Sequence, residues 1–333
     1  MSSVQIIAEI GNTHEGSVGL AKCFITSAAQ CGVDSVKFQV HIFDEESLPN
    51  APNPPYFKDE TREEYFNRTA FSVEQWKQLK DHCSSENVEF LASPFSEAAV
   101  DLLEEVGVSS YKIPSGEVTN LPLLEKIAAL GKPVLLSSGM SSWAELDDAF
   151  NTLKNNGCKN IILLQCTSAY PCPPEKAGLN VLDEMKDRYG VPVGFSDHTF
   201  GSAIPIAAVL KGAVVIEKHF TLSQGMYGSD AKHSTLPEDF KQLVNDIRAI
   251  ETAFSNPIVK DEEVKHLTTM KETFEKSIVA KVDLAKGHTI KKEDLTYKKP
   301  GIYIPANQVE TVIGKTTTTA IQANTPLQAD QLQ

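Results

Sequence analysis

Residues 192–220 read PVGFSDHTFGSAIPIAAVLKGAVVIEKHF and contain a complete strand–helix–strand unit. Two short apolar runs, at residues 192–198 and 214–220, flank a helical stretch that ends beside Gly212, a residue type favoured at helix C-termini. Two strands joined by a helix in this way lie parallel in one sheet. The first 260 residues repeat this unit throughout, which is the pattern of a parallel α/β fold.

Eight apolar runs are spaced along this part of the chain. They are residues 4–11 (VQIIAEIG), 35–40 (SVKFQV), 89–95 (EFLASPF), 111–116 (YKIPSG), 133–139 (PVLLSSG), 161–167 (IILLQCT), 192–198 (PVGFSDH) and 214–220 (VVIEKHF). Between them, Ser72 with Gln75 and Ser142 with Glu145 form capping boxes that predict helix starts. Eight consecutive units predict a closed (β/α)8 TIM barrel. An open doubly wound sheet is the alternative, but it carries a glycine fingerprint after its first strand, where this chain reads GNTHEG.

Composition limits the possible partners. With 333 residues, 41% of them hydrophobic, and a formal net charge of -13, the chain is expected to be a globular protein that binds neither nucleic acid nor an anionic membrane surface. The N-terminal residues contain no signal-peptide core, and no apolar run approaches the ~20 residues of a membrane span, so we expect a cytoplasmic protein. The six cysteines include no CxxC pair and are expected to remain reduced thiols.

Polar stretches and the positions of Gly and Pro divide the sequence into three segments. Residues 1–258 are predicted to form the barrel, residues 259–276 a linker, and residues 277–333 a small, mostly β domain. A Pro- and Asn-rich insertion at residues 41–71 is interpreted as a substrate lid, with a surface loop as the alternative. From residue 280 on, seven Lys and five acidic residues give a net charge of +2, whereas the rest of the chain is acidic. The small domain is therefore expected to dock on the acidic barrel, either in the same chain or in a neighbouring chain.

The ends of the predicted strands carry polar side chains, which matters because catalytic groups of such barrels lie at the carboxyl ends of the strands. In chain order they are Glu9; Lys37 and Gln39; Ser93; Lys112 and Ser115; Ser137; Thr167 and Ser168; Ser196 and His198; and Glu217 and His219. Because alternate residues of a strand share a face, Lys37 and Gln39 are predicted to point into the barrel while Phe38 points to the helices. The pattern therefore predicts a polar cavity at this end of the barrel.

Two histidines predict a metal site. His198 and His219 end neighbouring strands, which lie about 4.8 Å apart in a sheet, so their rings can share one divalent cation. Two imidazoles with the remaining coordination positions open suit a catalytic Mn²⁺ or Mg²⁺ ion better than structural zinc, which takes four protein ligands.

Two lysines predict an anion site. Lys37 and Lys112, with the hydroxyl groups around them, suit a multiply charged oxyanion such as a phosphate. The alternatives are an internal salt bridge of these lysines with Glu9 or Glu117, or a covalent Schiff-base role for one of them.

The motifs AEIGNTHEGS, VKFQ, SPFS, YKIPSGE, LLSSGM, LLQCTSAYP, GFSDHT and IEKHFT, in this order, resemble the N-acetylneuraminate (sialic acid) synthase family, including its legionaminate and pseudaminate branches. The motif YKIPSGE favours the neuraminate and legionaminate branches. The later sequence SIVAKVDLAKGHTIKKEDLTYKKPG resembles the antifreeze-like (SAF) domain of that family. The resemblance covers nearly the whole chain and implies a domain-swapped homodimer, in which the small domain of one chain covers the barrel mouth of the other.

The resemblance also implies roles for individual residues. Phosphoenolpyruvate would be held by Lys37, Ser93, Lys112, Ser115, Ser137, Ser168 and Ser196, the metal by His198 and His219, and the amino sugar by Gln39, Asn50 (with Asn53 as a close competitor), Tyr170 and Asp230. The family usually has an Arg-Pro-Gly whose arginine reaches the sugar, and here Lys299-Pro300-Gly301 takes that place. The catalytic candidates are Glu117, Glu9 and Lys37, with Glu117 the first choice of base and Glu9 the second.

The implied reaction joins phosphoenolpyruvate to N-acetylmannosamine or a related 2-acetamido sugar and yields a nonulosonic acid and phosphate. C3 of phosphoenolpyruvate attacks a metal-polarised aldehyde, water adds at C2 with help from a carboxylate, and C–O cleavage releases phosphate. Two alternatives are a Schiff-base aldolase on the same barrel and a non-catalytic sugar-binding protein.

Overall fold

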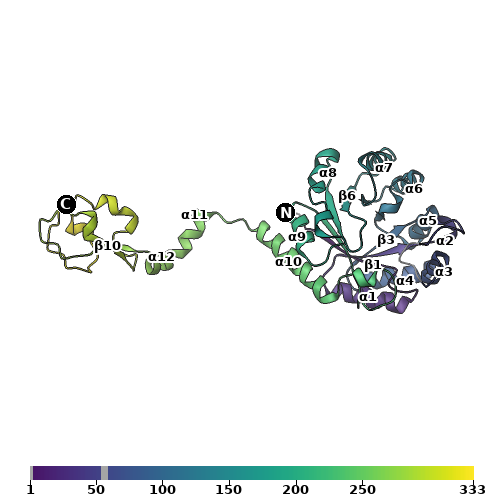
Figure 1. Ribbon diagram of the computed structural model, residues 1–333, viewed down its shortest axis with the longest axis horizontal. Helices are drawn as coiled ribbons and strands as arrows, with labels where there is room; N and C mark the ends of the chain where they lie inside the picture. Colours follow the sequence, from purple (N-terminus) through teal and green to yellow (C-terminus); the bar gives the residue numbers. More distant parts are fainter. Residues whose placement is uncertain (1–2, 54–58) are drawn as a thin grey trace. The chain divides into compact units, whose positions relative to one another are not determined.

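The computed structural model describes residues 3–53 and 59–333, which divide into two compact units, Met1–Ser255 and Asn256–Gln333 (Figure 1). Each unit has its own apolar core. Among the described residues, no helix combines the length and the apolar composition that crossing a bilayer requires.

Eight parallel strands form the first unit, and all eight lie within the predicted apolar runs. They are β1 (Gln5–Gly11), β2 (Ser35–Val40), β3 (Glu89–Pro94), β4 (Tyr111–Ile113), β5 (Val134–Ser137), β6 (Ile161–Cys166), β7 (Val193–Asp197) and β8 (Val215–His219). The hydrogen-bonded order is β3-β2-β1-β8-β7-β6-β5-β4, and β3 also packs against β4, so the sheet closes on itself. The prediction of a (β/α)8 barrel is confirmed.

Helices surround the strands (Figure 1). They are α1 (Val18–Gln30), α4 (Val73–Ser85), α5 (Glu97–Val106), α6 (Leu121–Ala129), α7 (Trp143–Asn155), α8 (Val181–Tyr189), α9 (Ala203–Leu210) and α10 (Pro237–Ser255). Short 3-10 helices, η1 (Ser115–Glu117), η2 (Pro174–Lys176) and η3 (Ala231–His233), follow β4, β6 and β8. Both predicted capping boxes are present, since Ser72 and Ser142 accept from the backbone N–H groups of Gln75 and Glu145. The six cysteines are all free thiols, as predicted.

The pleat of the strands sorts the core into an outer and an inner part. On β1, Ile6 and Ala8 belong to the large core between strands and helices, whereas Ile7 faces the barrel interior. The inner apolar cluster, formed by Ile7, Leu91, Leu135, Leu164 and Val215, fills one end of the barrel. Further along the same inward-facing rows stand buried polar groups such as Glu9 and Glu217. The barrel therefore has an apolar floor beneath a polar chamber.

The insertion at residues 41–71 is partly helical. It contains α2 (Phe43–Glu46) and α3 (Arg62–Thr69), and α3 begins with a complete capping box between Thr61 and Glu64. Residues 54–58 of the predicted lid lie outside the described residues. The side chains of Tyr65 and Phe66 on α3 line the main cavity, so this segment forms part of the cavity wall.

The second unit is a small, mostly irregular β domain. Its two antiparallel strands, β9 (Ser277–Ala280) and β10 (Leu295–Lys298), enclose a core that includes Ile278 and Leu327. Three 3-10 helices, η5 (Lys292–Asp294), η6 (Ala306–Thr311) and η7 (Ala329–Gln331), complete it. The segment predicted as a linker is helical, with α11 (Lys260–Glu263), η4 (Val264–Leu267) and α12 (Thr268–Phe274). The N–H of Gly301 donates to the carbonyl of Glu272 at 2.7 Å and ties α12 to this unit.

A buried ion pair joins β7 to β8 on the side opposite the chamber. Asp197 and Lys218 are partners in the ladder, and the Lys218 ammonium lies 2.5 Å from the carboxylate of Asp197 and 2.5 Å from the carbonyl of Thr199. Both side chains are almost fully buried. Each residue directly precedes a predicted metal ligand, His198 or His219, so the pair fixes the two strand ends that carry these imidazoles.

Replacing Lys218 with Met should destabilise the barrel by about 3–5 kcal/mol, because it leaves the Asp197 carboxylate buried without its counter-ion. Both tryptophans, Trp76 and Trp143, belong to the first unit, so tryptophan fluorescence during urea unfolding follows the barrel specifically. As a control, Lys77→Met removes the exposed pair with Glu105 and should cost no more than about 1 kcal/mol. A change of that small size for Lys218→Met would show that the buried pair does not stabilise the strand ends.

Candidate active site

A cavity of about 600 Å³ opens at the carboxyl ends of the strands and collects most of the predicted site residues. Its lining includes Glu9, Lys37, Gln39, Lys112, Ser115, Glu117, Ser137, Ser168, Tyr170, Ser196, His198, His219 and Asp230. Ser93 is buried just behind this lining, where its hydroxyl accepts from the Lys37 ammonium at 3.4 Å. Asn50 and Lys299 are not among the lining residues.

Two lysines and two glutamates form a buried ion-pair network at the bottom of the cavity. The Lys37 ammonium lies 2.8 Å from Glu9 and 3.8 Å from Glu217, and the Lys112 ammonium lies 3.0 Å from Glu217. The Ser196 hydroxyl donates to Glu217 at 2.9 Å. The internal salt bridge considered from the sequence is therefore present for Lys37 and Glu9, while the partner of Lys112 is Glu217 and not Glu117.

These pairs keep the network charged. Burial opposes ionisation of Glu217, but the ammonium groups of Lys112 and Lys37 outweigh it and hold the pKa of this carboxyl well below its usual range. Burial likewise lowers the pKa of Lys37, but Glu217 and Glu9 raise it above the ordinary value on balance. An ammonium group carries three donors, so each paired lysine retains hydrogens for an anionic ligand.

Beside the lysines is a pocket of hydroxyl groups. The hydroxyls of Ser115 and Ser137 are 2.9 Å apart, and the backbone N–H of Gly139 donates to Ser115 at 3.2 Å. A Cβ atom at Gly139 would lie 2.4 Å from the Ser115 hydroxyl and 2.6 Å from that of Ser168. Glycine at position 139 therefore keeps open a small space that the Ser115 and Ser168 hydroxyls and the Cys166 thiol border, and Ser137 adjoins it through its contact with Ser115. Hydroxyl groups gathered in this way suit a compact oxyanion.

The two predicted metal ligands face each other across β7 and β8. The ring centroids of His198 and His219 are 5.4 Å apart, and His198 Nδ1 lies 2.8 Å from the Thr167 carbonyl, which leaves its Nε2 for a ligand. Nδ1 of His219 is buried and has no hydrogen-bond partner in the part of the chain that the structure describes. Over residues 3–53 and 59–333, no cluster of three or more His, Cys, Asp or Glu side chains has the geometry of a metal site. The residues fit a cation held by two imidazoles, with oxygens of water or a ligand completing its coordination.

Proton affinity differs between the two imidazoles. Burial lowers the pKa of His219, which favours the neutral form that binds metals. Burial also acts to lower the pKa of His198, but the Cys166 thiol 3.9 Å away and the Thr167 carbonyl raise it on balance. His198 therefore holds a proton more tightly than His219 does, and a cation must compete with that proton, so metal affinity should fall as the pH decreases.

Glu117 lies on η1 at the cavity wall, away from the lysines. Burial raises the pKa of its carboxyl, although the Asn120 amide donates to it at 2.8 Å and partly offsets this effect. A carboxyl with a raised pKa exchanges protons closer to neutral pH, which suits a general base. Glu9 is placed differently, because the Gln39 amide donates to one of its oxygens at 2.8 Å and Lys37 pairs with the other.

The predicted sugar-facing residues fall into two groups. Tyr170 packs its ring on His198 at 4.2 Å, and Asp230 accepts from the Ser229 hydroxyl at 2.9 Å, so both border the cavity. Asn50 is exposed, whereas Asn53 accepts from the backbone N–H of Arg62 at 2.9 Å and supports the insertion. Lys299 belongs to the second unit, where its ammonium lies 4.8 Å from the ring centre of Phe274.

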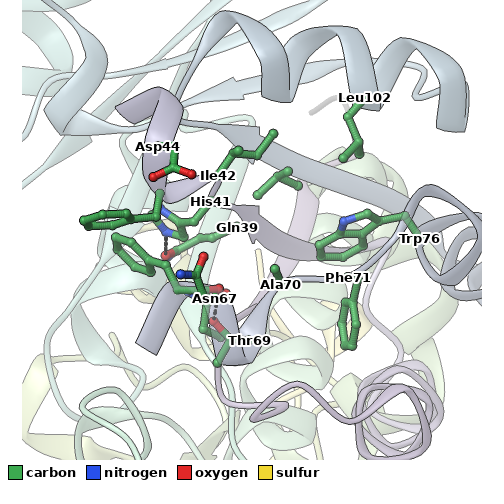
Figure 2. A pocket seen from close by; sticks show the side chains of 14 residues that line it. Gln39, His41, Ile42, Asp44, Asn67, Thr69, Ala70, Phe71, Trp76 and Leu102 are labelled. Atoms are coloured by element: carbon green, nitrogen blue, oxygen red, sulfur yellow. Dashed lines mark hydrogen bonds between the residues drawn. The ribbon is translucent and has the colours of Figure 1, made fainter. Parts of the chain in front are cut away.

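Several lining residues were missed in the sequence. They include Asn12, His41, Glu46, Arg62, Cys166, Lys232 and His233. Cys166 could have been found, because it ends β6 at an inward-facing position two residues after Leu164. His41 follows Gln39 by two residues and continues the same face past the end of β2. It lines both the main cavity and a smaller side pocket, which also includes Trp76 and Leu102 (Figure 2).

Comparison with known proteins gives matches along the whole chain. The NeuB family matches residues 24–258 and the SAF domain matches residues 275–333. The N,N'-diacetyllegionaminic acid synthase of Campylobacter jejuni is 41% identical over 327 residues, which cover 96% of this chain and 97% of that protein. The N-acetylneuraminate-9-phosphate synthase of Mus musculus is 34% identical, covering 98% and 92%. The crystal structure of the N-acetylneuraminic acid (sialic acid) synthetase from Leptospira borgpetersenii is 32% identical, with a TM-score of 0.69 and coverage of 81% of this chain and 93% of that one.

The facing imidazoles predict one Mn²⁺ ion per chain, measured by the loss of the free-ion signal in electron paramagnetic resonance. Replacing His198 or His219 with Ala should weaken Mn²⁺ binding about 100-fold or more, because each removes one of only two protein ligands. His82→Ala is the control, since His82 lies on α4 and bonds Thr26 outside the cavity. Wild-type affinity in both variants would locate the cation elsewhere.

Proposed function

This chain belongs to the NeuB family, and we propose that it condenses phosphoenolpyruvate with N-acetylmannosamine or a related 2-acetamido sugar to give a nonulosonic acid and phosphate. Relatives of similar length are synthases of legionaminic, pseudaminic and N-acetylneuraminic acid products. The observation that carries the proposal is the single cavity in which two lysines, a hydroxyl pocket and two facing imidazoles meet. Such a set suits one anionic substrate beside one carbonyl substrate.

The proposed place of phosphoenolpyruvate is the lysine and hydroxyl side of the cavity. Lys37 and Lys112 supply positive charge, and the hydroxyl groups of Ser115, Ser137 and Ser168 supply directional donors. The proposed contacts also include Ser196, whose hydroxyl donates to Glu217 in this structure, and Ser93 behind Lys37. The space above Gly139 supports this placement, because the hydroxyl groups of Ser115 and Ser168 and the thiol of Cys166 border it. Lys37 then has two roles. It binds the anionic substrate, and it stabilises the negative charge that develops on the phosphate group as the C–O bond breaks.

Mn²⁺ or Mg²⁺ is proposed as the cofactor, held by His198 and His219, and when bound it supplies Lewis-acid polarisation of the sugar aldehyde. The chain positions the two substrates so that C3 of phosphoenolpyruvate faces the aldehyde carbon. A new C–C bond forms there, and C2 gains positive character. Water adds to C2, and cleavage of the bond between C2 and the bridging oxygen releases phosphate.

Glu117 is proposed as the base that takes the proton from this water. Its support is the raised pKa of its carboxyl and its place on the cavity wall, where it forms no ion pair with any side chain of the described residues. Glu9 remains the second candidate. Because Glu9 is engaged by Lys37 and Gln39, we propose that it orients those two side chains.

The sugar is proposed to bind on the side of Gln39, Tyr170 and Asp230, with Asn50 and a Lys299 from a partner protomer as further contacts. We propose a domain-swapped homodimer in which the small unit of one protomer covers the cavity mouth of its partner. Support comes from the opposite net charges of the two parts of the sequence and from exposed apolar side chains on the barrel loops, including Met140 and Phe200. A reaction that consumes phosphoenolpyruvate also favours a cytoplasmic location.

The two alternatives are less well supported. A Schiff-base aldolase needs a neutral lysine amine, whereas the carboxylates around Lys37 raise its pKa and keep it protonated. A sugar-binding protein without catalysis gains nothing from buried ion pairs that cost free energy to desolvate.

The proposal is tested by incubating the protein with phosphoenolpyruvate, Mn²⁺ and a panel of acceptors: N-acetylmannosamine, its phosphorylated form and a diacetamido analogue. Phosphate release should require both substrates, with one phosphate formed for each nonulosonic acid. In H₂¹⁸O, the label should enter the C2 hydroxyl of the product and not the phosphate, because the C–O bond breaks. Phosphate release without any acceptor, or none with every acceptor, would contradict the proposal.

Glu117→Gln should lower kcat by about 10²–10⁴-fold with little change in the KM for phosphoenolpyruvate, since the amide cannot accept a proton. In the wild type, the activity should fall as the pH decreases through the raised pKa of Glu117, so the acidic limb lies above the ordinary Glu value of 4.5. Glu45→Gln, an exposed change on α2, is the control. A normal kcat and an unchanged acidic limb in Glu117→Gln would transfer the role to another group.

A further inference from the structure

A chain of hydrogen bonds connects the insertion to the bottom of the cavity. His41 Nδ1 lies 2.8 Å from a Glu46 carboxylate oxygen, and His41 Nε2 lies 3.2 Å from Gln39 Oε1. The Gln39 amide donates from Nε2 to Glu9 at 2.8 Å, and Glu9 pairs with Lys37. Figure 2 shows the hydrogen bond between His41 and Gln39 among the side chains that line the side pocket.

The polarity of this chain is fixed at both ends. The Glu9 carboxylate accepts, so the amino group of Gln39 must face it and the carbonyl oxygen of Gln39 must face His41. His41 therefore donates to Gln39 from Nε2, and it donates from Nδ1 to the Glu46 carboxylate, so both ring nitrogens carry a hydrogen in this arrangement. One N–H and one lone pair of the Gln39 amide remain, which is a donor and an acceptor on a group whose rotation is blocked from both sides.

The His41 ring is held on both faces as well. Phe66 stacks on it at 3.9 Å with an interplanar angle of 5°, and Phe95 stacks on the other face at 4.0 Å and 24°. The side chains of His41 and Glu46 are each only 8% exposed, so bulk water does not compete for their hydrogen bond. Phe66 lies on α3 and Glu46 on α2, and thus two elements of the insertion determine where this ring stands.

We propose that His41 is a positioning residue for the acceptor sugar, which holds the Gln39 amide in one orientation through a stack and hydrogen bonds supplied by the insertion. The inference rests on the proposed function, because Gln39 is placed there on the acceptor side. The free N–H and lone pair of Gln39 match the hydroxyl and acetamido groups of a 2-acetamido sugar, which offer both donors and acceptors. The insertion thereby acts on acceptor recognition through His41.

His41→Phe tests the inference, because phenylalanine keeps a ring between Phe66 and Phe95 but lacks both nitrogens. The KM for the acceptor should rise about tenfold, the size expected for losing a partner of a buried polar group, while the KM for phosphoenolpyruvate stays within about twofold. His41→Gln restores a donor toward Gln39 and should recover part of the acceptor KM. His82→Phe is the control, since His82 also lies beside a glutamate, Glu86, but on an outer helix.

A crystal structure of His41→Phe provides a readout that does not depend on turnover. We expect the Gln39 amide to leave its hydrogen bond with Glu9, whereas an unmoved amide would overturn the inference. An unchanged acceptor KM in a folded His41→Phe variant, or equal rises for both substrates, would also overturn it while the proposed function stands. Failure of the wild type with every acceptor would instead count against the proposed function alone. If His41→Phe does not fold, Glu46→Gln weakens the same support, and the same split between the two KM values is expected.

Discussion

The polar cavity of this barrel depends on buried positive and negative side chains that neutralise one another. Two ammonium groups, those of Lys37 and Lys112, and two carboxylates, those of Glu9 and Glu217, are almost fully buried among parallel strands. Removing such groups from water is costly, and their pairing recovers that cost only when the geometry is good. A barrel that needed only stability would fill this space with apolar side chains. The network is therefore best understood as preparation for an anionic ligand.

The strand pleat makes this arrangement possible. The inward-facing rows carry an apolar layer that includes Ile7 and Val215, followed by the charged layer, while the outward-facing rows pack against the helices. The floor keeps water from reaching the network from below. Behind β7 and β8, the Asp197–Lys218 pair holds the two strand ends in register. The facing positions of His198 and His219 follow from that register.

The insertion after β2 extends the site beyond the barrel ends. Its helices place Phe66 and Glu46 around His41, and His41 places the amide of Gln39. The network that begins at Glu46 thus continues through Glu9 to Lys37. The proposed acceptor side and the proposed anion side are parts of one hydrogen-bonded structure, although one lies partly on the insertion and the other on the barrel strands.

The sequence by itself determined the eight strands, the face on which each strand-end residue stands, and the adjacency of His198 and His219, because pleat alternation and the order of parallel strands are local consequences of the chain. Only the tertiary structure decided which groups meet across the barrel. Lys112 on β4 pairs with Glu217 on β8 and not with nearby Glu117, since closure of the sheet brings distant strands together in the interior. The space kept open at Gly139 and the stack around His41 depend in the same way on side chains far away in the sequence, which no local pattern encodes.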